Sequence, residues 1–283
     1  MLSVLYSCSS NVEIDIQDYD QKIVVDGWIE SGGYANILLT MSSPFLSSFD
    51  SASIRATFVN YGKITLTSSK GESEILTLFS QDDLFPPYVY RSISIRGEVG
   101  CTYNLKVEVM GNTVTSSTTI PEIPDITGLK MDATSDSSGI LKTGVYPKGG
   151  KHEFLLFMVK SKKAKDRNFH PAQIPIFWVP ETTNHIYVKI FRDYETNMYL
   201  LFPEKYPYSN WTKLEYALND TIMVKTGMID QVSYDLLNSV YSDMAIQKNP
   251  FSFSNSGVKT NIIGGIGRWT GIGLAPLQTY YGR

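Results

Sequence analysis

Three glutamates in the second half of the chain are of the residue type that glycoside hydrolases use as general acid and nucleophile. Glu153, Glu181 and Glu195 are widely spaced, and no motif places two of them on one element. The sequence also has no Gly-x-Ser-x-Gly nucleophile elbow. A hydrolase whose carboxylates, or whose Ser/His/Asp triad, converge only in the folded chain therefore stays an alternative.

The histidines and glycines lack the spacing of a metal or nucleotide site. His152, His170 and His185 are far apart, whereas zinc needs three or four converging ligands. Gly265-x-Gly267-x-x-x-Gly271 resembles a phosphate-binding loop, but such a loop opens a helix, and only 12 residues follow here. We expect no metal or other cofactor, and we interpret these glycines as part of a C-terminal strand that packs closely or carries a bulge.

Three irregular stretches rich in aromatic residues and proline are the strongest candidates for a binding surface. They span residues 84–90, 169–178 and 202–211. Stiff loops that present Tyr and Trp suit a small molecule, a glycan or a peptide, because flat rings give contact area at low entropic cost. The alternative for each ring is that it packs as core at the end of a sandwich. The candidate contact residues are Phe85, Tyr88, Tyr90, Trp178, Tyr206, Tyr208 and Trp211.

Charge excludes one class of partner. The formal net charge is −3 and charged residues make up 19% of the chain, so no global field recruits nucleic acid or an anionic membrane. The one dense basic run, residues 160–167, favours a solvated loop between strands. Its functional alternative is contact with phosphorylated lipid headgroups or with an acidic rim on a partner.

A short apolar run ends in Leu5-Tyr6-Ser7-Cys8, which resembles the lipobox of bacterial lipoproteins. Acylation of Cys8 would tether the protein to a membrane. No Lys or Arg precedes Cys8 and the run is shorter than the usual 7–15 residues or so, so either the true start lies upstream or the match is accidental. The alternative is an exposed cysteine, disulfide-bonded to Cys101. No apolar run approaches the ~20 residues of a membrane helix.

The elements that must position these residues read as antiparallel β-structure. The clearest pair runs over residues 100–109 and 113–119, where alternate residues from Cys101 to Val109 are apolar. This alternation predicts that Cys101 is buried as a small hydrophobe. One amphipathic helix is predicted near 231–247, with Asp230 as its N-cap. The remaining predicted strands are 23–29, 36–41, 53–59, 63–67, 74–78, 126–131, 152–159, 174–179, 186–191, 198–202, 221–225 and 258–263.

Two prolines, Pro121 and Pro124, favour an extended linker and so a domain boundary. We therefore expect a mainly β protein with two β-sandwich-like domains, the first of them immunoglobulin- or fibronectin-like. The predicted organisation is a signal or lipobox remnant at 1–8, a polar tether at 9–21, an N-terminal β-sandwich at 22–121, and a C-terminal β-rich domain with the helix at 122–283.

The order of these features resembles DUF4249, a family of Bacteroidetes outer-membrane lipoproteins. The matching pieces are the lipobox cysteine, residues 24–29, 100–105, 233–235, 249–251 and 261–267, and the pair Ile120-Pro121. The resemblance implies two β-rich domains on the cell envelope, often encoded beside a TonB-dependent transporter, and it implies no catalytic residues.

The functional expectation is a lipid-anchored, non-enzymatic protein that assists such a transporter by binding its substrate or capping its barrel. The alternatives are an envelope hydrolase and a structural or adhesin module. Acidic residues directly after the lipidated cysteine mark export to the cell surface in many such lipoproteins. Because the first acid here is Glu13, the leaflet stays open, with the cell surface favoured.

Overall fold

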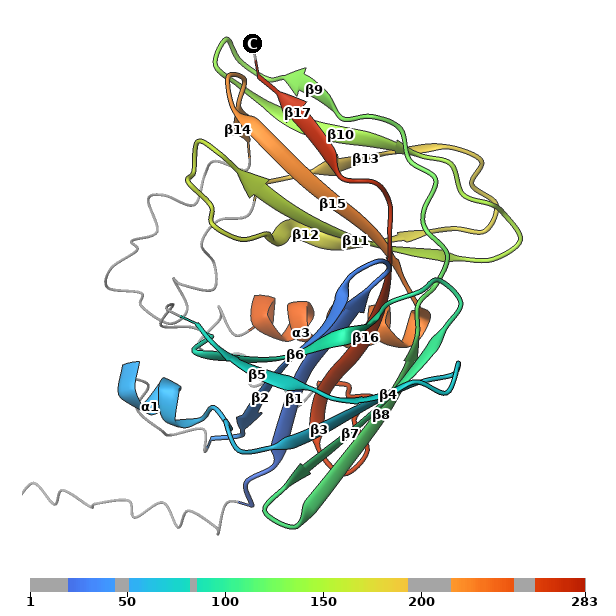
Figure 1. Ribbon diagram of the computed structural model, residues 1–283. Coiled ribbons are helices and arrows are strands. Elements are labelled where there is room, and N and C mark those ends of the chain that lie inside the picture. The colour runs from blue at the N-terminus through green and yellow to red at the C-terminus, as the bar shows by residue number, and fades with distance from the viewer. Residues whose placement is uncertain (1–19, 44–50, 82–85, 193–214, 247–257, 283) are drawn as a thin grey trace, which may run out of the picture.

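β-Strands make up most of the regular structure in the described part of the chain (Figure 1). The computed structural model describes residues 20–43, 51–81, 86–192, 215–246 and 258–282. The first-half strands are β1 (Ile23–Glu30), β2 (Tyr34–Met41), β3 (Lys63–Ser68), β4 (Ser73–Ile75), β5 (Thr77–Ser80), β6 (Tyr88–Arg96), β7 (Thr102–Val109) and β8 (Asn112–Thr119). The second-half strands are β9 (Lys130–Ala133), β10 (Ser138–Val145), β11 (Glu153–Ser161), β12 (His170–Val179), β13 (Ile186–Ile190), β14 (Tyr216–Ala217), β15 (Thr221–Ile229), β16 (Ile266–Leu274) and β17 (Gln278–Tyr281). The described helices are α1 (Ser51–Ala56) and α3 (Gln231–Ile246).

One long sheet runs through both halves of the chain. Its strand order is β12-β11-β15-β16-β1-β2-β6-β5, and β17 pairs with β15 beside this path. A four-stranded sheet of β4, β3, β7 and β8 packs against the first-half strands, and a second one of β9, β10, β13 and β14 packs against the second-half strands. The predicted mainly β, sandwich-like architecture is therefore confirmed, whereas the immunoglobulin-like detail stays a prediction.

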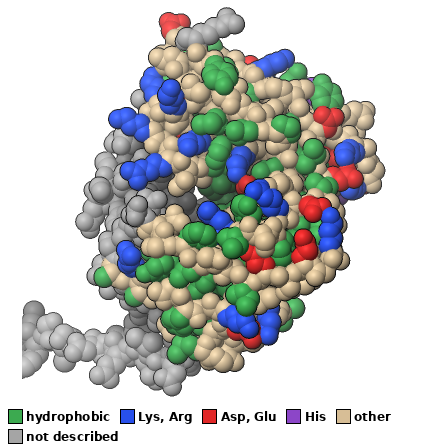
Figure 2. Space-filling view, in the orientation of Figure 1, with side chains coloured by type: hydrophobic (Ala, Val, Ile, Leu, Met, Phe, Trp, Pro, Cys, Tyr) green, Lys and Arg blue, Asp and Glu red, His purple; other side chains and the backbone are tan. Residues whose placement is uncertain are grey.

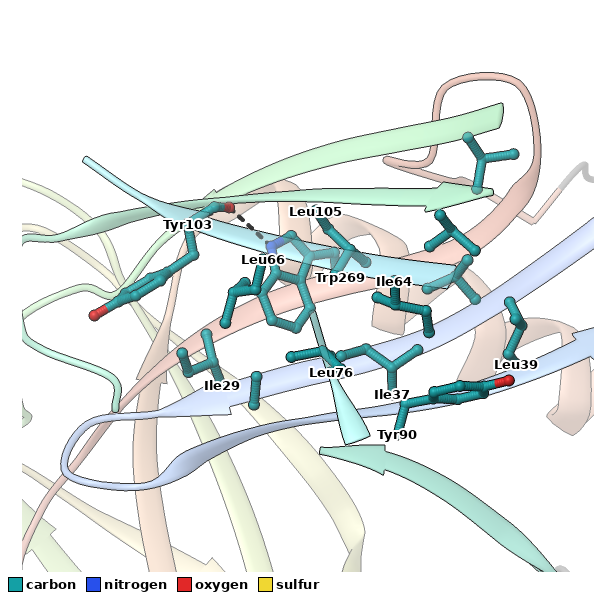
Figure 3. Packing of buried hydrophobic residues seen from close by; sticks show 14 of the residues in the cluster. Ile29, Ile37, Leu39, Ile64, Leu66, Leu76, Tyr90, Tyr103, Leu105 and Trp269 are labelled. Atoms are coloured by element: carbon teal, nitrogen blue, oxygen red, sulfur yellow. Dashed lines mark hydrogen bonds between the residues drawn. The ribbon is translucent and has the colours of Figure 1, made fainter. Parts of the chain in front are cut away.

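The first core lies between the first-half strands of the long sheet and the β4-β3-β7-β8 sheet. Period-two alternation buries Val25 and Ile29 on β1, and Tyr103 and Leu105 on β7. The indole of Trp269, which comes from β16 in the second half, fills the centre of this core (Figure 3). The strand that carries it pairs in parallel with β1, as with Gly27 opposite Trp269.

The glycine-rich segment near the C-terminus is β16 itself. Its glycines lie where another backbone passes close by: a Cβ on Gly271 would be 2.8 Å from the carbonyl oxygen of Thr119. The close-packing interpretation is thus confirmed, because a strand in mid-sheet offers no helix N-terminus to a phosphate.

Helix α3 covers the other face of the long sheet. Asp230 caps it, since its Oδ1 accepts a hydrogen bond from the Ser233 N–H at 2.7 Å, as the sequence predicted. Leu236 and Leu237 are buried on its inner face. Among the described residues, no helix is long and apolar enough to span a membrane.

Four predicted elements differ. Residues 126–131 were expected to form a strand, but Ile126 makes only an isolated bridge, with Val145, and β9 begins at Lys130. Residues 53–59 were expected to form a strand, but Ser51–Ala56 is helix α1 and only Phe58 makes a bridge, with Thr40 of β2. Residues 74–78 are not one strand: β4 and β5 belong to different sheets. Residues 258–263 were expected to be a strand, but only Ile263 makes a single bridge, with Thr115. The predicted strand 198–202 lies outside the described residues.

One segment of the predicted second domain, 122–283, packs in the core of the predicted first domain, 22–121. Ile262 and Trp269, which lie in the predicted second domain, belong to the first hydrophobic core. The second core draws on residues between Leu141 and Val224. The segment from residue 262 to 274 therefore returns to the first sandwich, and β17 then pairs with β15 in the second half.

Candidate functional site

The structure places the predicted aromatic contact residues in different environments. Trp178 lies on β12, where its side chain is 45% exposed and its ring is 5.1 Å from that of His152. Tyr88 on β6 is half-buried, with the Arg55 guanidinium 5.9 Å from its ring. Because β12 and β6 lie near opposite edges of the long sheet, Trp178 and Tyr88 do not share a surface on it.

Tyr90 is a core residue. It is 3% exposed, its hydroxyl donates to the Val59 carbonyl at 3.1 Å, and that hydroxyl accepts from the Gly62 N–H at 2.9 Å. The core alternative thus holds for this ring, which is not presented to a ligand. Phe85, Tyr206, Tyr208 and Trp211 lie outside the described residues.

A polar cavity of about 440 Å³ opens at one end of the second sandwich. It is formed where β10 begins, β11 ends and β14 turns into β15, and Arg192 follows β13 along its wall. The residues that line it are Ser137, Ser138, Ser161, Lys163, Ala164, Arg192, Glu215, Tyr216, Ala217 and Asp220. Figure 2 shows several basic side chains on the upper part of the visible face of the molecule. Figure 1, in the same orientation, places strands of the second half there.

Two carboxylates of this cavity are already hydrogen-bonded within the protein. Asp220 is 4% exposed; its Oδ2 accepts from the Ser161 hydroxyl at 2.6 Å and its Oδ1 from the Lys163 N–H at 2.9 Å. Glu215 accepts from the Ser138 hydroxyl at 2.5 Å, and hydrogen bonds from Ser138 and Thr134 lower the pKa of Glu215. Carboxylates that are oriented in this way, as acceptors for neighbouring hydroxyl and N–H groups, suit the fixing of a polar surface.

The basic run forms the loop between β11 and β12, as predicted. Its shape is set by side-chain acceptors: Asp166 Oδ2 accepts from the Ser161 N–H at 2.7 Å and contacts His170 Nε2 at 3.0 Å. Lys163 adds a hydrogen bond from its Nζ to Asn219 at 2.8 Å. The loop is therefore one wall of the cavity, and only Lys163 of its lysines lines it.

Sequence reasoning did not identify this cavity. Asp220, Ser161, Arg192 and Glu215 belong to no recognisable motif in the sequence. One signal was available: the aromatic-rich segment 202–211 lies between Arg192 and Glu215, both of which line the cavity.

The two described glutamates that were considered for hydrolysis differ in burial and in partners. Glu153 is 2% exposed, and its Oε1 accepts from the Lys148 N–H at 2.9 Å. Glu181 is exposed beyond the end of β12, and Glu195 lies outside the described residues. The histidines are also separate, and no group of three or more metal-ligating side chains occurs in the described part of the chain.

Comparison with known proteins defines the family. No curated protein matches the sequence. Among solved structures, a DUF4785 family protein from Legionella pneumophila is 10% identical with a TM-score of 0.22; the match covers 74% of this chain and 52% of that one, so this chain spans about half of that protein. The family model described as "Domain of unknown function (DUF4249)" matches residues 9–272, and the chain belongs to that family.

Proposed function

We propose that this chain is a lipid-anchored, non-enzymatic protein of the bacterial outer membrane, with the cell surface as its favoured location. In this role it assists a TonB-dependent transporter in nutrient uptake, by binding the transported substrate or by capping the barrel. The observation that carries the proposal is the lipobox-like Leu5-Tyr6-Ser7-Cys8, directly before residue 9, at which the family match begins.

The state of the second cysteine supports the assignment of Cys8. Cys101 is a free, buried thiol whose Sγ lies 3.3 Å from the Ser69 hydroxyl. Burial within the first core gives Cys101 a packing role of its own, so Cys8 is the cysteine left for acylation.

The non-enzymatic part of the proposal draws on the cavity at the end of the second sandwich. Asp220 and Glu215 accept hydrogen bonds that hold their carboxylates in fixed orientations. A wall of oriented hydroxyls, carboxylates and basic groups suits recognition of a polar molecule.

The anchor is tested in the native host, with the gene expressed from its own locus and cells fed an alkyne fatty acid. We expect wild-type protein and a Cys101→Ala variant to take up the label and to fractionate with outer membranes. Cys8→Ala should lose both properties. A Cys8→Ala protein that still fractionates with the membrane would overturn the anchor.

The partnership is tested by purifying the native protein from outer membranes in a mild detergent that preserves known transporter complexes. Co-purification of a transporter barrel is the expected result, and protease treatment of intact cells reports the leaflet. Recovery without any barrel would contradict the partnership. Turnover of an oligosaccharide that disappears in Glu215→Gln would identify an enzyme instead.

A further inference from the structure

Three lysines stand in one row across the outer face of the small second-half sheet. The strand register places Lys142 of β10 directly opposite Lys130 of β9 on one side and Lys189 of β13 on the other. Their neighbours Leu141 and Val188 face the second core, so the lysines face away from it. Like charges directly opposite one another destabilise a sheet, so this row is held at a cost to stability.

Three aromatic rings continue this surface. Tyr146 and His185 are stacked with centroids 4.4 Å apart, and His185 meets Tyr187 edge-on at 4.7 Å. Tyr187 is paired with Gly144, where an added Cβ would lie 2.9 Å from His185 Nε2. The missing side chain at Gly144 thus leaves the space in which these rings lie.

The lysines and the rings form one continuous patch. The Nζ atoms of Lys142 and Lys130 lie 5.3 Å and 6.0 Å from the centre of the Tyr187 ring. Tyr146 is 43% and Tyr187 is 49% exposed. Packing over Gly144 accounts for the position of Tyr187. It explains neither the exposure of Tyr146 nor the row of lysines.

The charge of the patch is only partly neutralised. Within the described residues, one carboxylate lies in ion-pair range of these lysines: Asp132, whose Oδ2 is 2.7 Å from Lys142 Nζ. The lysines therefore outnumber their acidic partner on a protein whose net charge is −3. This local excess of positive charge calls for an anionic ligand, whereas exposed rings call for a flat, partly apolar one.

We propose that this patch, defined by Lys130, Lys142, Lys189, Tyr146, His185 and Tyr187, binds an acidic carbohydrate chain. Apolar faces of its sugar rings stack on the tyrosines, and its carboxylate or sulfate groups lie along the lysine row. A carbohydrate is favoured because tyrosine faces and a lysine row lie together on one open sheet face, where the apolar faces and the acidic groups of one sugar chain meet both; nucleic acid is an outcome that the test distinguishes. This inference does not depend on the lipid anchor, because neither Cys8 nor the N-terminal segment contributes to the patch.

The test is a titration of the purified chain with four probes: alginate oligosaccharide, dextran sulfate, neutral dextran and a 20-residue oligothymidylate. We expect binding of one or both acidic carbohydrates, weaker in high salt, and none of neutral dextran. Alginate and dextran sulfate separate a carboxylated from a sulfated ligand. Absence of binding by both, or oligothymidylate binding as tight as theirs, would overturn the proposal.

Variants locate the site. Tyr187→Ala and the double change Lys130→Gln with Lys189→Gln should each weaken binding at least about fivefold, and the double change should also reduce its salt dependence. Tyr187→Phe should retain binding because it keeps the ring face. Tyr281→Ala, at a 73% exposed tyrosine elsewhere in the second half, is the matched control. If Tyr187→Ala unfolds, Tyr187→Leu keeps bulk over Gly144 without an aromatic face. Wild-type affinity in both Tyr187→Ala and the lysine double variant would overturn the site.

Discussion

The indole Nε1 of Trp269 donates a hydrogen bond to the backbone carbonyl of Tyr103 at 2.9 Å, across 166 residues of sequence. Trp269 is fully buried, and its backbone is held as well: its N–H donates to Asn261 Oδ1 at 2.9 Å. One side chain thus joins the long sheet to the β4-β3-β7-β8 sheet that faces it (Figure 3).

Trp269→Ala should lower the free energy of unfolding by about 3–5 kcal/mol, because it leaves a large cavity in the first core. Trp269→Phe should cost less, since most of the ring volume remains while the hydrogen bond is lost. Denaturant unfolding followed by circular dichroism measures both. A loss below about 1 kcal/mol for the alanine variant would contradict a central packing role.

Gly27→Ala should also destabilise the first core. The new Cβ would lie 2.8 Å from Trp269 Cε3 and 3.2 Å from Ile37 Cγ1, and overpacking of this kind costs about 1–3 kcal/mol. Gly128→Ala is the matched control, because nothing lies within 4 Å of its added Cβ. Thermal melts should show a lowered midpoint for Gly27→Ala alone.

Glu74 makes the first sandwich sensitive to acid. Its carboxylate accepts from the N–H groups of Ile93 at 2.6 Å and Ile95 at 2.9 Å, and from the Ser94 hydroxyl at 2.7 Å. Burial raises the pKa of Glu74, but the hydrogen bonds from Ile95, Ile93 and Ser94 together lower it below its ordinary value of 4.5.

A carboxylate whose pKa is lowered by folding stabilises the protein above its unfolded pKa, and that contribution is lost as the pH falls through the folded pKa. Glu74→Gln should therefore cost about 1 kcal/mol near pH 7 and reduce the loss of stability below about pH 4.5. Glu181→Gln, at an exposed glutamate, is the control. Stability curves for wild type and Glu74→Gln that stay parallel through the acid range would contradict this role.

Cys101 should react slowly in the native state. Burial raises the pKa of its thiol, while hydrogen bonds with Ser69 and Tyr103 lower it by more, so the pKa lies below its ordinary value. Access is the limit, because the residue is 4% exposed. In a Cys8→Ala background, iodoacetamide should label Cys101 on the order of tenfold or more slowly than the unfolded chain. Equal rates would show that the first core opens readily.

The elements that sequence predicted best are those in which one local pattern specifies the structure. Alternation from Cys101 to Val109 predicted β7 and its buried face, and Asp230 marked the start of α3. The strand predicted for residues 53–59 was wrong because Ile54, Ala56 and Phe58 alternate over too few residues to exclude a short helix. The course of β16 depends on a strand more than 200 residues away, and no local pattern records such a partner.

Site residues were harder to predict for the same reason. The cavity joins Ser161, Arg192 and Asp220 through three separate connections between strands. The basic patch arises because Lys130, Lys142 and Lys189 meet only through the register of three strands. Tyr90 shows the converse: a ring in an aromatic run can be core, because burial is decided by the face of the strand on which it lies.

The central position of β16 also has a consequence for biosynthesis. Asp26 of β1 leaves the ribosome 242 residues before Arg268, the β16 residue with which it forms an ion pair at 2.5 Å. Until then β1 is paired only with β2, and the N-terminal sandwich lacks the parallel strand β16 with the tryptophan at its centre. Most proteins of this size complete their N-terminal unit first, while translation continues. Here the first sandwich is complete only when residues 266–274 have been made, almost at the end of synthesis.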